Sequence, residues 1–329
     1  EVPAVGCVDD VLNGYFQSMV WSPGIALLSN WWPGDKRGFA TGFANGFSGF
    51  GQVFAALTVS LAFIVIPGFG WKAGFVLPAA FMVVAGLLYI FIAKDSPKKI
   101  GLKEYVDNDA KRNEQDAELK KLVAEHGKLF PYLYLLKKWR FDCWLLIIAA
   151  SSIARYGLLT WVPTYYVQEF DVDIKDGALG TVLLPLGMAV GTIVIPWISD
   201  KFFAENRLPM VIICAGVSGV TVFTFMKVEP GFAAGALLFI AGFFIYAING
   251  LVWAYATDVG GRAFAGTAAG VLDCFAYLGA SVQAIYFGSV LTNSGNWTLV
   301  FTAIAGVCAA IIIISIIAGW GLNKKKDLA

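Results

Sequence analysis

Residues 143–163 read CWLLIIAASSIARYGLLTWVP, an apolar run that a single charge, Arg155, interrupts. From Cys143 to Gln168 no other side chain is fully charged at neutral pH, and the run is long enough for a helix that crosses a bilayer. An arginine at that depth costs at least about 2.5–3.5 kcal/mol and keeps its proton. We therefore expect Arg155 to bind an anion, with a structural pair to a buried carboxylate as the alternative.

The whole chain has the composition of a membrane protein. Of its 329 residues, 58% are hydrophobic and 15% aromatic, and the mean hydropathy is +0.70. These values exclude an ordinary soluble domain and indicate an all-α, polytopic membrane protein. The five cysteines show no CxxC spacing, and His126 is the single histidine. The sequence therefore predicts no metal site, no cofactor and no enzyme activity.

Nine apolar runs are each long enough, at about 19 residues or more, for a membrane-spanning helix. They cover residues 11–34, 38–66, 73–93, 143–168, 177–199, 208–226, 231–257, 263–291 and 297–323.

A polar stretch divides these runs into three and six. We expect residues 1–93 to form the remainder of an N-terminal half, residues 94–140 a central loop, and residues 141–329 a C-terminal half of six helices. Transporters are commonly built from repeated halves, and a long loop between two six-helix halves would fall here. The nine runs then correspond to helices four to twelve of twelve, with the first three absent; a true nine-helix protein is the alternative.

Lysine and arginine are unevenly distributed between alternate loops. Residues 94–140 hold twelve of them, and the short loops predicted on the same side hold eight, against three on the other side. The positive-inside rule therefore predicts that the central loop and the C-terminus are cytoplasmic and that the acidic loop 169–176 is external. A multi-pass protein of the plasma membrane is expected. The mixed charges of residues 109–128 predict a surface helix and no nucleic-acid site.

Four stretches carry a resemblance to a known family. They are residues 13–23 (NGYFQSMVWSP), 155–165 (RYGLLTWVPTY), 195–201 (IPWISDK) and 266–279, which contains GTAAG and FAYLG. In this order they resemble the organophosphate:phosphate antiporters of the major facilitator superfamily, which include bacterial glycerol-3-phosphate and hexose-6-phosphate transporters. The resemblance implies a major facilitator fold and a secondary transporter that exchanges a phosphorylated metabolite for inorganic phosphate.

The same resemblance implies a set of site residues. Arg155 matches the arginine of the C-terminal half that binds the phosphoryl group. Tyr246 and Tyr277 match tyrosines that face the central cavity, and Trp21 and Asn45 match cavity-side positions of the fourth and fifth helices. The partner arginine of the N-terminal half belongs to the first helix, which this chain does not contain.

One position departs from the family pattern. Ser48 stands where the glycerol-phosphate and hexose-phosphate carriers have a histidine, three residues after the asparagine. This difference leaves the mechanism and the substrate open.

Further candidates follow from the residues themselves. Asn249 lies one turn after Tyr246, and Ser151 and Ser152 lie on the Arg155 face of their helix, where they either bind ligand or join helices. Asp273 is a second full charge inside a span. It pairs with Arg155 in the empty protein, carries a coupling proton, receives a cationic part of the substrate, or forms a purely structural contact.

Two features concern the helix ends and helix packing. Asp200, Lys201 and Arg37 lie at predicted cytoplasmic helix ends, where they form gating salt bridges or anchor the topology.

The glycines at 38, 42, 46, 49 and 51 begin with small-xxx-small spacing, and those at 266 and 270 repeat it, which predicts close helix contacts.

The sequence thus predicts a monomeric transporter in the lipid bilayer with a small anionic substrate, either a phosphate ester or inorganic phosphate. Two alternatives remain at this point. One is a proton-coupled symporter of another organic anion with Asp273 as the proton site. The other is a membrane sensor that binds sugar phosphate without transporting it.

Overall fold

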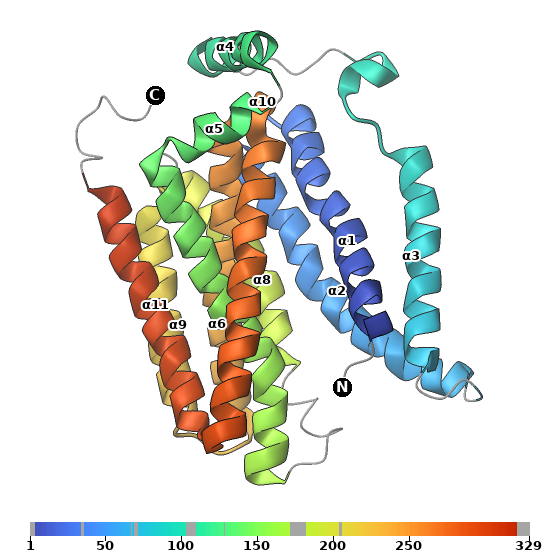
Figure 1. The fold of residues 1–329 in the computed structure, drawn as a ribbon, viewed down its shortest axis with the longest axis vertical. Helices are drawn as coiled ribbons and strands as arrows, with labels where there is room; N and C mark the ends of the chain where they lie inside the picture. The colour runs from blue at the N-terminus through green and yellow to red at the C-terminus, as the bar shows by residue number, and fades with distance from the viewer. Residues whose placement is uncertain are drawn as a thin grey trace.

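The computed structural model describes residues 4–33, 36–66, 68, 72–102, 110–127, 129–171, 182–203 and 206–320, and it is helical almost throughout these ranges (Figure 1). The helices are α1 (Ala4–Trp31), α2 (Arg37–Val65), α3 (Ala73–Ile92), α4 (Ala110–His126), α5 (Phe130–Leu136), α6 (Trp139–Phe170), α8 (Leu183–Phe202), α9 (Leu208–Phe225), α10 (Phe232–Ser294) and α11 (Trp297–Gly319). A short 3₁₀ helix, Pro97–Ile100, follows α3.

Within the described residues, six helices are long and apolar enough to cross a membrane: α3, α6, α8, α9, α10 and α11. The all-α, polytopic architecture is therefore confirmed. The runs 11–34 and 38–66 form α1 and α2, which are not among the six, so the count of nine spans stays a prediction. The start of the run 177–199 and the lysines of the C-terminal tail lie outside the described residues.

Helix α10 contains two predicted spans. Its 63 residues are interrupted at Gly261, where φ is 52° and ψ is −153°. A side chain is strongly disfavoured in this region of φ and ψ, so glycine lets the chain reverse there. The predicted runs 231–257 and 263–291 correspond to the two halves of α10, residues 232–260 and 262–294.

Helix α10 is the centre of a bundle. It packs against α6, α8 and α9 and, on the opposite side, against α1 and α2, whereas α3 contacts α2 and is otherwise almost entirely exposed. The backbones of α8 and α10 touch directly, because a Cβ atom placed on Gly191 would overlap the carbonyl of Phe243. Such close approach is characteristic of membrane helices, whose association depends on packing rather than on the hydrophobic effect.

The described parts of the loops predicted to be cytoplasmic lie at one end of the bundle (Figure 1). At this end α1 finishes, α2 begins, α4 and α5 cover the Gly261 turn, and α11 finishes. We call it the basic end, because Arg37, Arg207 and Arg262 lie there. The indole nitrogen of Trp31 donates a hydrogen bond to the carbonyl of Lys94 over 2.7 Å, which ties the ends of α1 and α3 together.

Helices α2 and α8 meet along a glycine seam near the basic end. A Cβ atom on Gly42 would lie 2.8 Å from the carbonyl oxygen of Thr192, and one on Gly49 would lie 2.7 Å from the Cβ of Ala189. Nothing lies within 4 Å of such an atom on Gly51, and α2 diverges from α8 toward the other end of the bundle (Figure 1). The close contact predicted from the glycine spacing is confirmed for the first half of α2.

Candidate anion-binding site

Arg155 lies in the middle of α6, half-buried between two aromatic rings. Its guanidinium carbon is 4.1 Å from the ring centre of Tyr156 and 5.0 Å from that of Tyr246. A cation–π contact uses the positive charge but leaves the N–H donors for an acceptor. The buried Nε has no hydrogen-bond partner in the described part of the chain. Arg155 therefore presents charge and an unused donor inside the bundle.

A polar network surrounds the second of these rings. The Tyr246 hydroxyl lies 3.3 Å from Oδ1 of Asn45 and 3.1 Å from Oγ of Ser48, and Nδ2 of Asn45 donates to Oγ1 of Thr192 over 2.8 Å. The network joins α2, α8 and α10, and it brings together three of the predicted site residues. Thr192 was not predicted; its only signal in the sequence is a hydroxyl in an apolar run beside a glycine.

Several buried polar atoms near this network have no partner among the described residues. They are Nε1 of Trp21, Oγ of Ser152 and Oδ1 of Asn249. Trp21 reaches α10 through Trp253, with ring centres 5.2 Å apart, and Trp253 and Asn249 lie one turn apart on the face of α10 that carries Tyr246. Buried polar groups are normally hydrogen-bonded, so these atoms indicate a site that a ligand completes.

The other serine in this part of α6 is occupied. The hydroxyl of Ser151 donates to the carbonyl of Ile148 over 3.1 Å, within its own helix. Of the two candidate serines, Ser152 is the one whose hydroxyl has no partner in the part of the chain that the structure describes.

Asp273 and Tyr277 border the same region from the second half of α10. Asp273 is half-buried and is an electrostatic neighbour of Arg155, and Tyr277, which is 53% exposed, is a neighbour of Arg155, Tyr156 and Asp273. Arg155 and Asp273 are nevertheless not an ion pair, since no nitrogen–oxygen distance between them is 4.0 Å or less. The structure thus does not show the direct pairing considered for Asp273.

An ion cluster closes the basic end. Arg207 donates from Nε to Asp258 over 2.9 Å and from Nη1 to Asp200 over 2.6 Å. Burial alone would lower the pKa of Arg207, but Asp258 and Asp200 outweigh it and raise the pKa above its ordinary value. The Asp200 carboxylate also lies against Gly38 in the first turn of α2. A carboxylate is favourable at a helix N-terminus, so Asp200 links α2 to the C-terminal bundle.

The predicted gating residues are only partly in this cluster. Arg37 is buried and its Nε donates to the carbonyl of Trp32 over 3.1 Å. Lys201 is exposed, with its ammonium 5.4 Å from the ring centre of Phe202. Arg207, which was not predicted, supplies the cation for Asp200. Its distance from Asp258 in the sequence, 51 positions, gave no indication of the contact.

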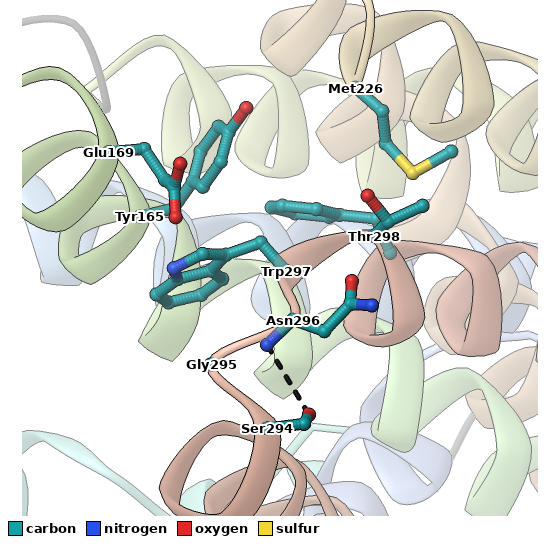
Figure 2. Close-up of a pocket in the computed structure, with 9 residues that line it drawn as sticks. Tyr165, Glu169, Met226, Ser294, Gly295, Asn296, Trp297 and Thr298 are labelled. Atoms are coloured by element: carbon teal, nitrogen blue, oxygen red, sulfur yellow. Dashed lines mark hydrogen bonds between the residues drawn. The ribbon is translucent and has the colours of Figure 1, made fainter.

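A cavity lies at the end of the bundle opposite the basic end, and Figure 2 shows residues that line it. It has a volume of about 390 Å³ and lies between the end of α6 and the turn from α10 to α11. Tyr165, on its wall, is ten residues beyond Arg155, or about 15 Å further along α6. Glu169 is among the described residues that line it, which include no lysine or arginine, so an anion is better accommodated at Arg155.

The fold and the site define a class: a polytopic helical membrane protein whose α6 carries a cation, Arg155, that forms no ion pair among the described residues and lies beside the network that joins α2, α8 and α10. Residues 10–284 match the family model of the Major Facilitator Superfamily, and the chain belongs to this family. The family consists of membrane transporters rather than enzymes.

The similar proteins agree with the resemblance seen in the sequence. The chain is 28% identical over 322 residues to the glycerol-3-phosphate transporter of Bacillus subtilis (strain 168), covering 96% of this chain and 71% of the relative. It is 27% identical to the membrane sensor protein UhpC of Escherichia coli (strain K12), covering 92% and 69%. The similarity to organophosphate:phosphate antiporters is thereby confirmed.

A solved structure shares the fold. The crystal structure of the transporter FucP in the outward conformation has a TM-score of 0.58, covering 90% of this chain and 71% of that one at 13% sequence identity. At this identity the match concerns the fold alone.

Proposed function

We propose that the protein is a secondary transporter that exchanges a phosphorylated metabolite, such as glycerol phosphate or a sugar phosphate, for inorganic phosphate by alternating access. Residues 1–93 and 141–329 contribute to its two halves, and residues 94–140 connect them. The basic end faces the cytoplasm of a bacterial cell, and the protein works as a monomer in the inner membrane.

Arg155 is the observation that carries this proposal. Its buried Nε has no hydrogen-bond partner among the described residues, and neither has Oγ of Ser152, which lies one turn away on the same helix. A phosphoryl group offers acceptor oxygens only, and the planar guanidinium fork suits it better than an ammonium group does. A bound phosphoryl group would satisfy donors that the protein leaves open and would compensate a charge that is costly within a membrane.

The contacts around the site support alternating access. The Asp200 cluster and the glycine seam hold α2 against α8 at the basic end, whereas the two helices diverge toward the other end (Figure 1). The described conformation is therefore closed on the side that we assign to the cytoplasm. Without substrate, the unpaired charge of Arg155 opposes closure around the site, which favours exchange over uniport.

Counterflow is the direct test. The purified full-length protein is reconstituted in liposomes loaded with inorganic phosphate, and entry of labelled phosphate is measured. We expect rapid exchange with internal phosphate, inhibition by external glycerol phosphate or hexose phosphate, and little uptake into empty liposomes. Uptake into empty liposomes that follows a proton gradient would instead support the proton-coupled alternative with Asp273 as the proton site.

A second function has one observation in its favour. The relative UhpC is named a membrane sensor protein, and the match to it covers 92% of this chain. A sensor would bind sugar phosphate at Arg155 without moving it. Binding without any exchange in the same liposomes would support the sensor and exclude the transporter.

A further inference from the structure

The Arg155 site contains acceptors that a phosphoryl group does not satisfy. Within the described part of the chain, neither the Asp273 carboxylate nor Oδ1 of Asn249, in a side chain only 3% exposed, has a hydrogen-bond donor. A phosphate dianion is itself an acceptor. It can therefore bind the donors of Arg155 and Ser152, but it leaves these two oxygens unpartnered.

Asp273 also places a negative charge within electrostatic range of Arg155, although more than 4.0 Å from its guanidinium nitrogens. The carboxylate is an electrostatic neighbour of Arg155 without forming an ion pair with it, so the arginine does not fully compensate it. A phosphoryl group bound at Arg155 would be repelled by this carboxylate, more strongly within the bundle than in water. A ligand that carries both charges would use this carboxylate as well as the arginine.

The surroundings of Asp273 suit a cation. Tyr277 is one turn away on the same helix, and its electrostatic neighbours are Asp273, Arg155 and Tyr156. Aromatic rings and phenol oxygens beside a carboxylate stabilise an ammonium group through cation–π contacts and hydrogen bonds. The Tyr277 side chain therefore interacts electrostatically with both the cationic and the anionic residue of the site.

We propose that the preferred substrate is a zwitterionic phosphate ester, with its phosphoryl group at Arg155 and an ammonium group at Asp273. Asn249 then accepts a hydrogen bond from a hydroxyl or amine elsewhere on the ligand. The inference rests on the proposed function, because it assumes that Arg155 binds the phosphoryl group. It adds the substrate class that the second intramembrane charge selects.

Pairs of phosphate esters that differ by one group test this inference. Inhibition of phosphate exchange by the full-length protein is compared for aminoethyl phosphate against hydroxyethyl phosphate, and for glucosamine 6-phosphate against glucose 6-phosphate. A hydrogen-bonded charge contributes enough to change affinity by roughly ten- to a hundredfold. We expect the amino member of at least one pair to inhibit at a concentration lower by about this factor.

Two variants locate the preference. Asp273→Asn should reduce the ratio between amino and hydroxy esters to about one, whereas Glu169→Gln, which removes a carboxylate at the far end of α6, should retain the ratio. Equal inhibition within both pairs by the unmodified protein would overturn the inference while phosphate exchange still stood. A preference that survives Asp273→Asn, or that is also lost in Glu169→Gln, would overturn the role of Asp273. Absence of phosphate exchange would refute the proposed function itself.

Discussion

Replacing Arg155 by lysine tests whether phosphate binding depends on the planar guanidinium group or only on its positive charge. The guanidinium lies 4.1 Å and 5.0 Å from two tyrosine ring centres, and its buried Nε has no partner in the described residues. Lysine retains the positive charge but offers a compact ammonium group in place of a planar fork. If the fork holds two phosphoryl oxygens, Arg155→Lys loses one charge-assisted hydrogen bond at this position.

That loss corresponds to roughly 1.5–3 kcal/mol, or about a ten- to hundredfold weaker binding of phosphate. Calorimetry or exchange kinetics on the purified full-length protein measures it. Arg140→Lys, an equivalent change at the start of the same helix, is the matched control and should leave phosphate affinity as it is. Normal affinity in Arg155→Lys would refute the assignment of the phosphoryl site.

The alternative for Arg155 makes the opposite prediction for a double variant. If the arginine only compensated Asp273, replacing both residues by leucine would restore function, because a buried pair can be exchanged for apolar residues at little cost. The two residues are not an ion pair in the structure, so we expect no recovery. Recovery of phosphate exchange in the double variant would show that the two charges serve each other and not a ligand.

Three further predictions concern packing, the ion cluster and orientation. Gly49→Ala should push α2 away from α8 at a cost of about 1–3 kcal/mol, because its Cβ would lie 2.7 Å from that of Ala189. Spin labels on the two helices should therefore move apart in Gly49→Ala but not in Gly51→Ala, where the space is open. Equal behaviour of the two variants would contradict the glycine seam. Arg207→Leu removes the cation that pairs with Asp200 and Asp258 and should lower the free energy of unfolding by about 3–5 kcal/mol, measured by thermal unfolding. Lys201→Leu, at an exposed site, should change it by less than about 0.5 kcal/mol. Similar losses in the two variants would argue against the ion cluster as the stabilising contact. A cysteine at the exposed Asn293, in a cysteine-free background, should react with an impermeant reagent added outside the cell, and labelling from the cytoplasmic side alone would reverse the orientation.

The sequence by itself determined the membrane class and the helical architecture, and it identified Arg155 as a charge within a span, whose role stays a prediction. These follow from local chemistry. An apolar run either reaches the thickness of a bilayer or does not, and a charge within such a run is costly whatever its neighbours are. The glycine spacing on α2 likewise predicted a close contact, because a stripe of residues without side chains marks one face of a helix.

Partners across helices were decided only by the tertiary structure. The hydroxyl of Tyr246 is hydrogen-bonded to Asn45, 201 positions away in the sequence. Thr192 joins the same network from a third helix, and no sequence motif predicted this contact. Arg207 rather than Lys201 neutralises Asp200, although Lys201 is its sequence neighbour. Adjacent residues on a helix point in different directions, so which cation meets a carboxylate depends on how the helices pack and not on their distance along the chain.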